Sequence, residues 1–94
     1  TRLAFLKLGD AYFGLENYNL ALKYYKTAAG RDPGNPVVYY SLGRTYEKLQ
    51  DKANALYAYQ EALKIAGDYQ EAAQAIKNLG KLEPVKGGGP NYRQ

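Results

Sequence analysis

The sequence Leu8-Gly9-Asp10-Ala11-Tyr12 returns 34 residues later as Leu42-Gly43-Arg44-Thr45-Tyr46, with leucine, glycine and tyrosine at the same three places. Aligning residues 2–35 with residues 36–69 gives eight identities: Leu8/Leu42, Gly9/Gly43, Tyr12/Tyr46, Leu15/Leu49, Ala21/Ala55, Leu22/Leu56, Tyr25/Tyr59 and Ala28/Ala62. About two identities would be expected by chance, and these fall on small, apolar and aromatic residues. The chain therefore contains a duplicated packing unit.

Apolar residues recur at three- and four-residue steps through both units, which predicts two amphipathic helices in each. The segment from Asp32 to Pro36 separates the units, because Pro33 and Gly34 end a helix and Asn35 and Pro36 suit the start of the next. Asn17 and Asp51 are expected to cap the second helix of each unit. With a last apolar segment, the pattern predicts five helices near residues 2–15, 18–30, 36–49, 52–66 and 69–82.

Gly9 and Gly43 stand in the middle of predicted helices, where glycine costs about 1 kcal/mol relative to alanine. We expect a close approach between helices to offset this cost. The second helix of each hairpin would lie against the glycine at Ala21 or Ala55, with Tyr12 or Tyr46 filling the space beside the contact.

Residues 70–82 have an apolar face and a polar face, but Lys77 and Gly80 stand where the two units have glycine and tyrosine. Asp68 and Glu71 have the spacing of a capping box at the start of this helix. We therefore expect residues 70–82 to form a capping helix that covers the last hairpin. Residues 83–94 contain too few apolar side chains to fold alone, so they are predicted to be a flexible C-terminal tail.

The composition excludes several kinds of site. The 94 residues include no cysteine and no histidine, so disulfides, Cys/His zinc sites and histidine acid–base pairs are ruled out. No phosphate-binding loop or nucleophile–base pair occurs either. We expect no enzyme activity, no metal and no cofactor.

The net charge of +4 is concentrated near one end of the chain. Residues 1–76 carry 9 basic and 8 acidic side chains, whereas residues 77–94 carry 4 basic and 1 acidic. A nucleic-acid-binding surface needs clustered cations on an ordered face, so nucleic acid is not the expected partner. Contact of the basic tail with nucleic acid or an anionic surface remains the weakest alternative.

No apolar run is long enough for a membrane span, and no signal peptide opens the chain, so we expect a soluble protein. The chain begins at Thr1 and contains no methionine, which suggests a piece of a longer polypeptide. Its compartment is not inferred.

The two units resemble the tetratricopeptide repeat, whose signature places a large residue, Leu-Gly, Tyr, Ala, an aromatic residue, Ala and Pro at fixed offsets. The first unit matches at Phe5, Leu8, Gly9, Tyr12, Ala21, Tyr25, Ala28 and Pro33, and the second at Tyr39, Leu42, Gly43, Tyr46, Ala55, Tyr59 and Ala62. Gly67 replaces the proline of the second unit. The resemblance implies an all-α solenoid, a right-handed superhelix of antiparallel helix hairpins. Its domain would cover residues 1–82, with repeats at 2–35 and 36–69 and the capping helix at 70–82.

By the same resemblance, the chain is expected to be a non-catalytic adaptor or scaffold that binds a protein or peptide in a concave groove lined by the first helix of each repeat. The groove positions are Leu6, Asp10, Phe13, Tyr40, Ser41, Arg44 and Glu47. Tyr40 and Arg44 are expected to anchor the ligand, and Asp10 to hold Arg44 in the unbound state. The carboxylate clamp that binds chaperone C-termini is disfavoured, because its places are taken by Leu6, Asp10, Ser41, Glu71 and Ala75.

Self-association is the alternative function. The N-terminal apolar residues Leu3 and Leu6, and with them Val37, would face a ligand, a preceding repeat or another copy of the chain. Stacking of two copies through Leu3, Leu6 and Leu20 is one form of this alternative.

Overall fold

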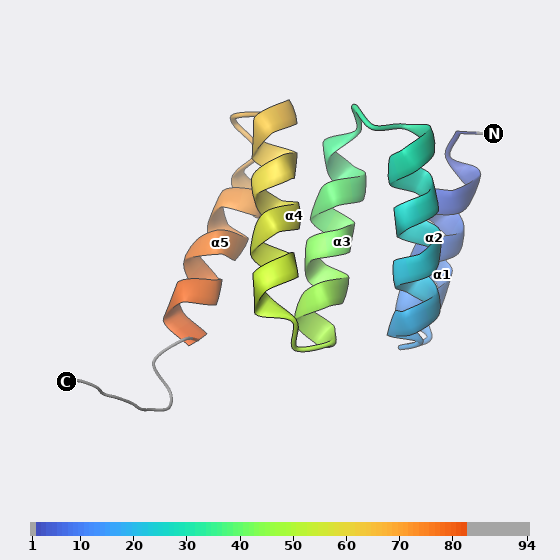
Figure 1. The fold of residues 1–94 in the computed structure, drawn as a ribbon, viewed down its shortest axis with the longest axis horizontal. Helices are drawn as coiled ribbons and strands as arrows, with labels where there is room; N and C mark the ends of the chain where they lie inside the picture. Colours follow the sequence, from blue (N-terminus) through green and yellow to red (C-terminus); the bar gives the residue numbers. More distant parts are fainter. Residues whose placement is uncertain (1, 83–94) are drawn as a thin grey trace.

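The computed structural model describes residues 2–82, which form five α-helices and no strand. The helices are α1 (Ala4–Gly14), α2 (Tyr18–Arg31), α3 (Pro36–Lys48), α4 (Lys52–Ile65) and α5 (Gln70–Leu82) (Figure 1). The predicted all-α fold is confirmed, and each helix lies within two residues of its predicted bounds. The predicted tail, residues 83–94, lies outside the described residues.

The predicted N-caps are confirmed at three helices. The side-chain Oδ1 of Asn17 accepts a hydrogen bond from the Leu20 amide at 3.3 Å, and Oδ1 of Asp51 accepts one from the Asn54 amide at 3.2 Å. Each bond satisfies one of the amides that a helix N-terminus leaves without a partner in the helix. Helix α5 begins at Gln70, so the cap position falls on Tyr69 and the third helical residue is Ala72; the predicted capping box of Asp68 and Glu71 is therefore wrong.

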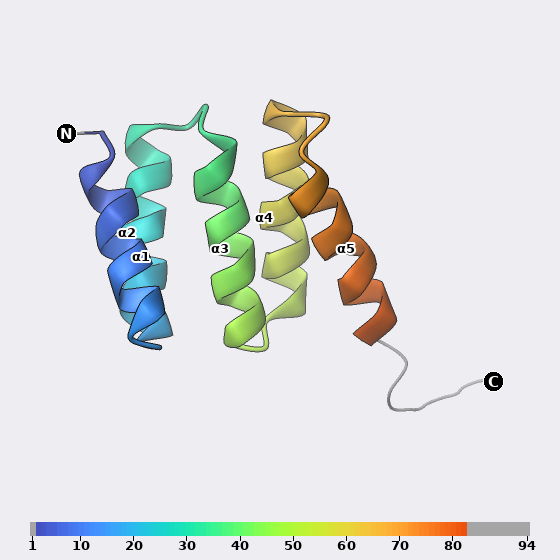
Figure 2. The same cartoon turned by 180° about the vertical axis from the view of Figure 1, so that it is seen from behind.

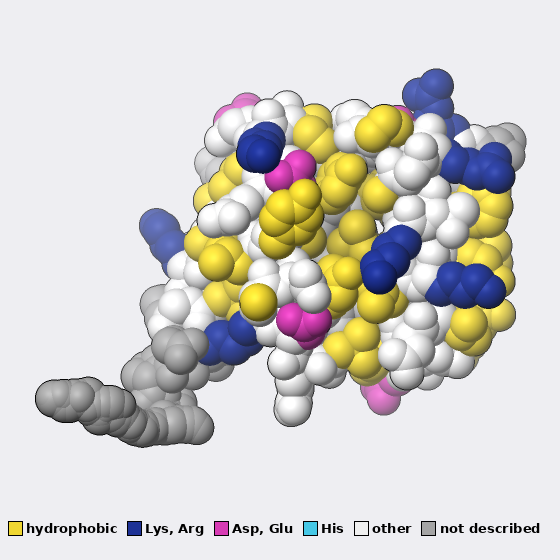
Figure 3. Space-filling model, in the orientation of Figure 1, with side chains coloured by type: hydrophobic (Ala, Val, Ile, Leu, Met, Phe, Trp, Pro, Cys, Tyr) yellow, Lys and Arg dark blue, Asp and Glu magenta, His cyan; other side chains and the backbone are white. Residues whose placement is uncertain are grey.

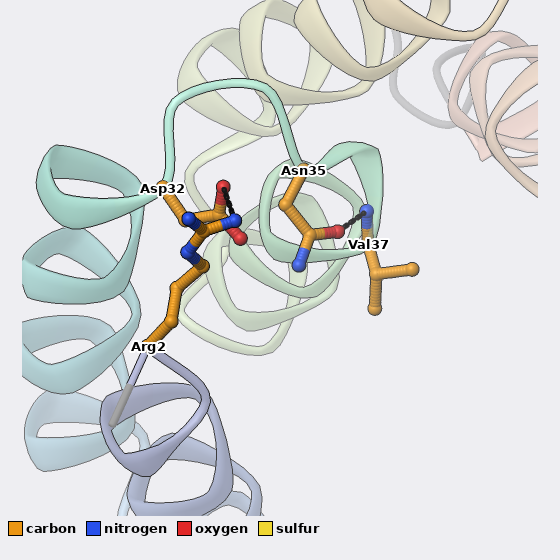
Figure 4. Close-up of polar contacts among 4 residues, drawn as sticks. All are labelled: Arg2, Asp32, Asn35 and Val37. Atoms are coloured by element: carbon orange, nitrogen blue, oxygen red, sulfur yellow. Dashed lines mark hydrogen bonds and ion pairs between the residues drawn. The ribbon is translucent and has the colours of Figure 1, made fainter.

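The junction between the two units is fixed by side chains on both sides of it (Figure 4). Oδ1 of Asn35 accepts a hydrogen bond from the Val37 amide at 3.0 Å, and Pro36 occupies the first turn of α3. Arg2 approaches Asp32 with 3.9 Å between Nη1 and Oδ1. The ion pair is long and its Arg2 side chain is 72% exposed, so we expect it to add little to stability.

Each helix packs against the next one along the chain, so the five form a single row of hairpins. Figure 2 shows α1, α3 and α5 toward the viewer, whereas α2 and α4 face the viewer in Figure 1. The two kinds of helix therefore form two faces. We call the surface made by α1, α3 and α5 the α1–α3–α5 face.

Two core clusters hold the row together. The first joins α2, α3 and α4 and consists of Ala21, Tyr25, Ala28, Val38, Leu42 and Ala58. The second joins α4 to α5 and consists of Ala55, Tyr59, Ala62, Ala72 and Leu79. Burial of a large apolar side chain contributes roughly 1.5–3 kcal/mol. The buried side chains of Ala72 and Leu79 therefore hold α5 against α4.

The partner of the mid-helix glycines differs from the prediction. A Cβ placed on Gly9 or Gly43 would lie 2.5 Å from Cδ1 of Tyr25 or Tyr59, respectively. The tyrosine ring, rather than Ala21 or Ala55, therefore takes the space that a side chain would need. Tyr12 and Tyr46 are only half-buried beside this contact. The close approach is confirmed, and its correct partner is the aromatic residue sixteen positions after each glycine.

Candidate functional site

Two core tyrosines present their hydroxyls to acidic residues of the α1–α3–α5 face. Tyr25 is 3% exposed and its hydroxyl donates to Oδ1 of Asp10 at 2.5 Å. Tyr59 is fully buried and its hydroxyl donates to Oε1 of Glu47. Each ring crosses the neighbouring helix at that helix's glycine. A tyrosine from α2 or α4 therefore fixes a carboxylate on α1 or α3, respectively.

Both hydroxyls stay protonated well above neutral pH. Burial raises the pKa of Tyr25 far above its usual range, and the hydrogen bond and charge of Asp10 raise it further. Burial likewise raises the pKa of Tyr59, together with the hydrogen bond and charge of Glu47. The positive charge of Arg44 acts to lower the pKa of both tyrosines, so Arg44 interacts electrostatically with both hydroxyls.

Arg44 is exposed and its guanidinium carbon lies 4.7 Å from the centroid of the Phe13 ring. This is a cation–π contact between α3 and α1. Among the described residues no ion pair joins Arg44 to Asp10, so the predicted Asp10–Arg44 contact is wrong. The carboxylate of Asp10 is engaged by Tyr25 instead, and the aromatic plane of Phe13 takes its place beside the guanidinium.

Tyr40 is half-buried between two other tyrosines. Its ring centroid lies 5.7 Å from that of Tyr59 and 5.4 Å from that of Tyr69, at tilted angles of 44° and 39°. Burial raises the pKa of Tyr69, and the charge of Glu71 adds to the shift. Tyr40 thus links α3 to α4 and to the start of α5, and only part of its ring is open to a ligand.

Ser41 and Leu6 contribute less exposed surface to this face. Ser41 is half-buried, and its carbonyl oxygen accepts a hydrogen bond from the Thr45 hydroxyl at 2.8 Å. The nearby side chain of Ser41 acts to lower the pKa of Tyr25, against the larger effect of burial. Leu6 is half-buried against the first core cluster.

The structure thus gathers Asp10, Ser41, Arg44 and Glu47 around the hydroxyls of Tyr25 and Tyr59, with Phe13 beside Arg44. Sequence reasoning assigned these two tyrosines to the core alone and missed that their polar ends reach this face. The signal was the tyrosine that follows the glycine by sixteen residues in both units.

An open pocket of about 440 Å³ lies where the starts of α3 and α5 meet. It is lined by Pro36, Val37, Ala66, Asp68, Tyr69, Gln70 and Glu71. Val37 is 45% exposed here, so the pocket offers apolar surface near the ring of Tyr69. An apolar side chain of a ligand is the group that such a lining fits.

The opposite face, made by α2 and α4, has a different character. Figure 3 shows apolar side chains over its middle, with Lys and Arg distributed around them rather than gathered in one patch. Tyr57 of α4 is 61% exposed. Such scattered cations lack the continuous basic footprint typical of nucleic-acid binding.

Two structural features are absent from residues 2–82. No helix there combines the length and the apolar character needed to cross a membrane. In the same part of the chain, no group of three or more acidic side chains is placed to hold a metal ion.

The family model for the tetratricopeptide repeat matches residues 6–69, which include both hairpins. The chain belongs to the tetratricopeptide repeat family. No curated protein matches the chain. Tetratricopeptide repeats generally mediate protein–protein interactions and are typically non-catalytic. This tetratricopeptide repeat chain therefore has the architecture of an interaction module.

Proposed function

We propose that the α1–α3–α5 face binds a protein partner through a peptide segment that carries a carboxylate close to an apolar or aromatic side chain. The interaction unit would be residues 1–82, with repeats at 2–35 and 36–69 and the capping helix at 70–82. The observation that carries the proposal is the arrangement of Arg44, which is exposed and has its guanidinium carbon over the ring of Phe13.

Within residues 2–82, no hydrogen bond or ion pair engages the N–H donors of Arg44, so these donors are available to a ligand while Phe13 contacts the guanidinium. A planar guanidinium with its edge open binds a carboxylate through two parallel hydrogen bonds. The neighbouring carboxylates of Asp10 and Glu47 each accept a hydrogen bond from a core tyrosine. Arg44 is therefore a cation of this face whose N–H donors a ligand's carboxylate can meet.

The apolar part of the ligand would contact Tyr40 and the pocket at the starts of α3 and α5. Tyr40 has few rotatable bonds to immobilise, and such aromatic residues often dominate binding energy. The contacts of its ring with the rings of Tyr59 and Tyr69 already hold Tyr40 in place. A rigid anchor beside a rigid cation favours a ligand in which the two chemical groups have a fixed spacing.

Selection from a displayed random-peptide library, with the immobilised chain as bait, tests this proposal. We expect recovered peptides to share an acidic residue near an apolar or aromatic one. Arg44→Ala should weaken their binding about ten-fold, as loss of a charge-assisted hydrogen bond does. Lys48→Ala removes an exposed cation from the end of the same helix and serves as the matched control. Recovery of basic peptides, or equal binding by the Arg44→Ala variant and the wild type, would contradict the proposal.

A further inference from the structure

We propose that a second copy of this chain docks on the outward side of α1, with the two α1 helices antiparallel. The surface concerned is the stripe formed by Ala4, Leu8, Ala11 and Leu15, which we call the α1 stripe. All four residues are exposed, Leu8 by 40% and Leu15 by 75%. The stripe lies apart from the residues proposed above to bind a peptide.

The duplication shows what kind of surface this is. The residues 34 positions later are Val38, Leu42 and Thr45, which are 1%, 6% and 0% exposed, and Leu49, which is half-buried. Val38 and Leu42 are buried because α2 packs on them within the first core cluster. The corresponding places on α5 include Ala72 and Leu79, which are buried against α4. The α1 stripe is therefore equivalent to the packing surfaces of α3 and α5. Unlike those two surfaces, it is covered by no helix within residues 2–82.

The side chains of the α1 stripe are complementary to themselves. Their spacing of four, three and four residues follows the seam of paired helices. About a two-fold axis between positions 9 and 10, Leu8 meets Ala11 of the second copy and Leu15 meets Ala4 of the second copy. Every large residue thus meets a small one, as close packing requires. A parallel pair would instead place leucine on leucine and alanine on alanine.

Charge does not oppose this pairing. The α1 stripe contains no ionisable side chain, and the nearest flanking cation is Lys7. In the antiparallel pair, the flanking residue nearest to Lys7 is Gly14 of the second copy. A Cβ placed on Gly14 would meet nothing within 4 Å, so this position leaves room for the lysine stem.

The other end of the row is a poorer match for the α1 stripe. The exposed residues of α5 are polar, and they include Gln70, Gln74, Lys77 and Asn78. Head-to-tail stacking of α1 on α5 would therefore bury polar groups against leucine, at a cost in free energy. Pairing of α1 with α1 buries apolar surface on both sides and closes the assembly at two copies.

These residues differ from those that the sequence suggested for stacking. Leu6 packs against the first core cluster, and Leu20 is half-buried, so both are partly occupied within one chain. Leu3, the remaining residue of that set, is 47% exposed, between Leu8 at 40% and Leu15 at 75%.

Sedimentation equilibrium tests the existence of the dimer. An interface of one helix pair falls at the small end of the range, below about 1,200 Å², so we expect a dissociation constant of roughly 10–100 µM. Leu15→Glu should raise that constant at least about ten-fold, since a carboxylate would be buried against alanine. Tyr57→Glu introduces the same charge at an exposed residue of α4 and should leave it unchanged. Both variants alter exposed residues, and circular dichroism checks that they fold.

Cross-linking tests the orientation, because the chain contains no cysteine. An equimolar mixture of Ala4→Cys and Leu15→Cys chains is treated with a short bis-maleimide linker. Random pairing alone gives about twice as much 4–15 product as of either homodimeric product, so we expect the 4–15 product to exceed each of them by far more than about two-fold. A ratio no higher than that of random pairing would contradict the antiparallel arrangement. Predominance of the two homodimeric products would overturn the antiparallel pairing. A monomer at every concentration up to about 1 mM, well above the expected dissociation constant, would overturn the proposal as a whole.

Discussion

The ring of Tyr59 lies against the backbone of α3 at Gly43, and its hydroxyl donates a hydrogen bond to Glu47 one turn further along the same helix. One side chain therefore joins α4 to α3 through both packing and a hydrogen bond. Tyr25 does the same for α2 and α1, but its acceptor is Asp10, the residue directly after Gly9. The glycine in each hairpin serves the core and the α1–α3–α5 face together.

The acceptor changes place between the two units, and this change creates the feature that carries the proposed function. The residue after the glycine is Asp10 in the first unit and Arg44 in the second. Four positions after the glycine the chain has Phe13 in the first unit and Glu47 in the second. The exchange brings a cation from α3 to an aromatic ring on α1, which two identical repeats would not do.

The first prediction concerns the glycine contact. Gly43→Ala should lower the free energy of unfolding by roughly 1–3 kcal/mol, because the added Cβ would overlap the ring of Tyr59 and force it to move. Gly14→Ala is the matched control, since nothing lies within 4 Å of its added Cβ. That variant should be unchanged or more stable, by up to about 1 kcal/mol, because alanine is the better helix former. Urea unfolding followed by circular dichroism measures both, and equal stability of the two variants would contradict the ring contact.

The prediction that the glycines mark a close approach came from the sequence, but the identity of the approaching residue did not. Periodicity gives the face of a helix that is buried and, with the duplication, it predicted five helices. The residue types at the turns predicted the caps of α2, α3 and α4. It does not give the rotation of α2 about its axis relative to α1, which decides whether Ala21 or Tyr25 covers Gly9. The candidate binding residues of the α1–α3–α5 face were predicted from their offsets within the repeat, which do not give side-chain contacts. Their ligand-binding role stays a prediction.

The contact between Arg44 and Phe13 was beyond sequence reasoning for a further physical reason. Opposite charge favoured Asp10 as the partner of Arg44. The hydroxyl of Tyr25, however, satisfies Asp10 from within the core, and that bond depends on the path of a ring between two helices. Long-range contacts of this kind follow from tertiary packing and not from local spacing.

The second prediction concerns alkaline pH. The pKa values of Tyr25 and Tyr59 are raised in the folded chain, so the unfolded chain loses these protons first as the pH rises. The stabilisation is fully present below the unfolded pKa of about 10 and is lost above it, by up to about 1.4 kcal/mol per pH unit for each tyrosine. Urea midpoints at several values between about pH 8 and about pH 11 measure the decline. The double variant Tyr25→Phe/Tyr59→Phe should decline less steeply, and an equal slope would exclude these hydroxyls as its cause.

The third prediction concerns the turns inside the two hairpins. Glu16 and Gln50, which are equivalent residues, have φ values of 61° and 63°. This left-handed conformation is strained for a residue with a Cβ and is free of that strain for glycine. Glu16→Gly and Gln50→Gly should each raise the thermal midpoint, with a gain of roughly 0.5–1 kcal/mol. Asn19→Gly, inside α2, is the matched control and should lower it by a similar amount. A lower midpoint for both turn variants would show that their side chains contribute more than the backbone strain removes.

The last prediction concerns the coupling between Arg44 and Phe13 in ligand binding. If the ring holds the guanidinium in place, part of the value of Arg44 to a bound carboxylate depends on Phe13, because a fixed donor loses less entropy when it binds. Calorimetric titration of a library-selected acidic peptide into the wild type, Arg44→Ala, Phe13→Leu and the double variant gives the coupling energy. We expect Arg44→Ala to cost about 1–2 kcal/mol, Phe13→Leu about 0.5–1 kcal/mol, and the pair less than their sum. The effect of Arg44→Ala should also shrink in high salt, since the guanidinium is exposed to screening. Strict additivity would mean that Phe13 contacts the peptide independently, whereas a Phe13→Leu variant with wild-type affinity would remove the ring from the binding surface altogether.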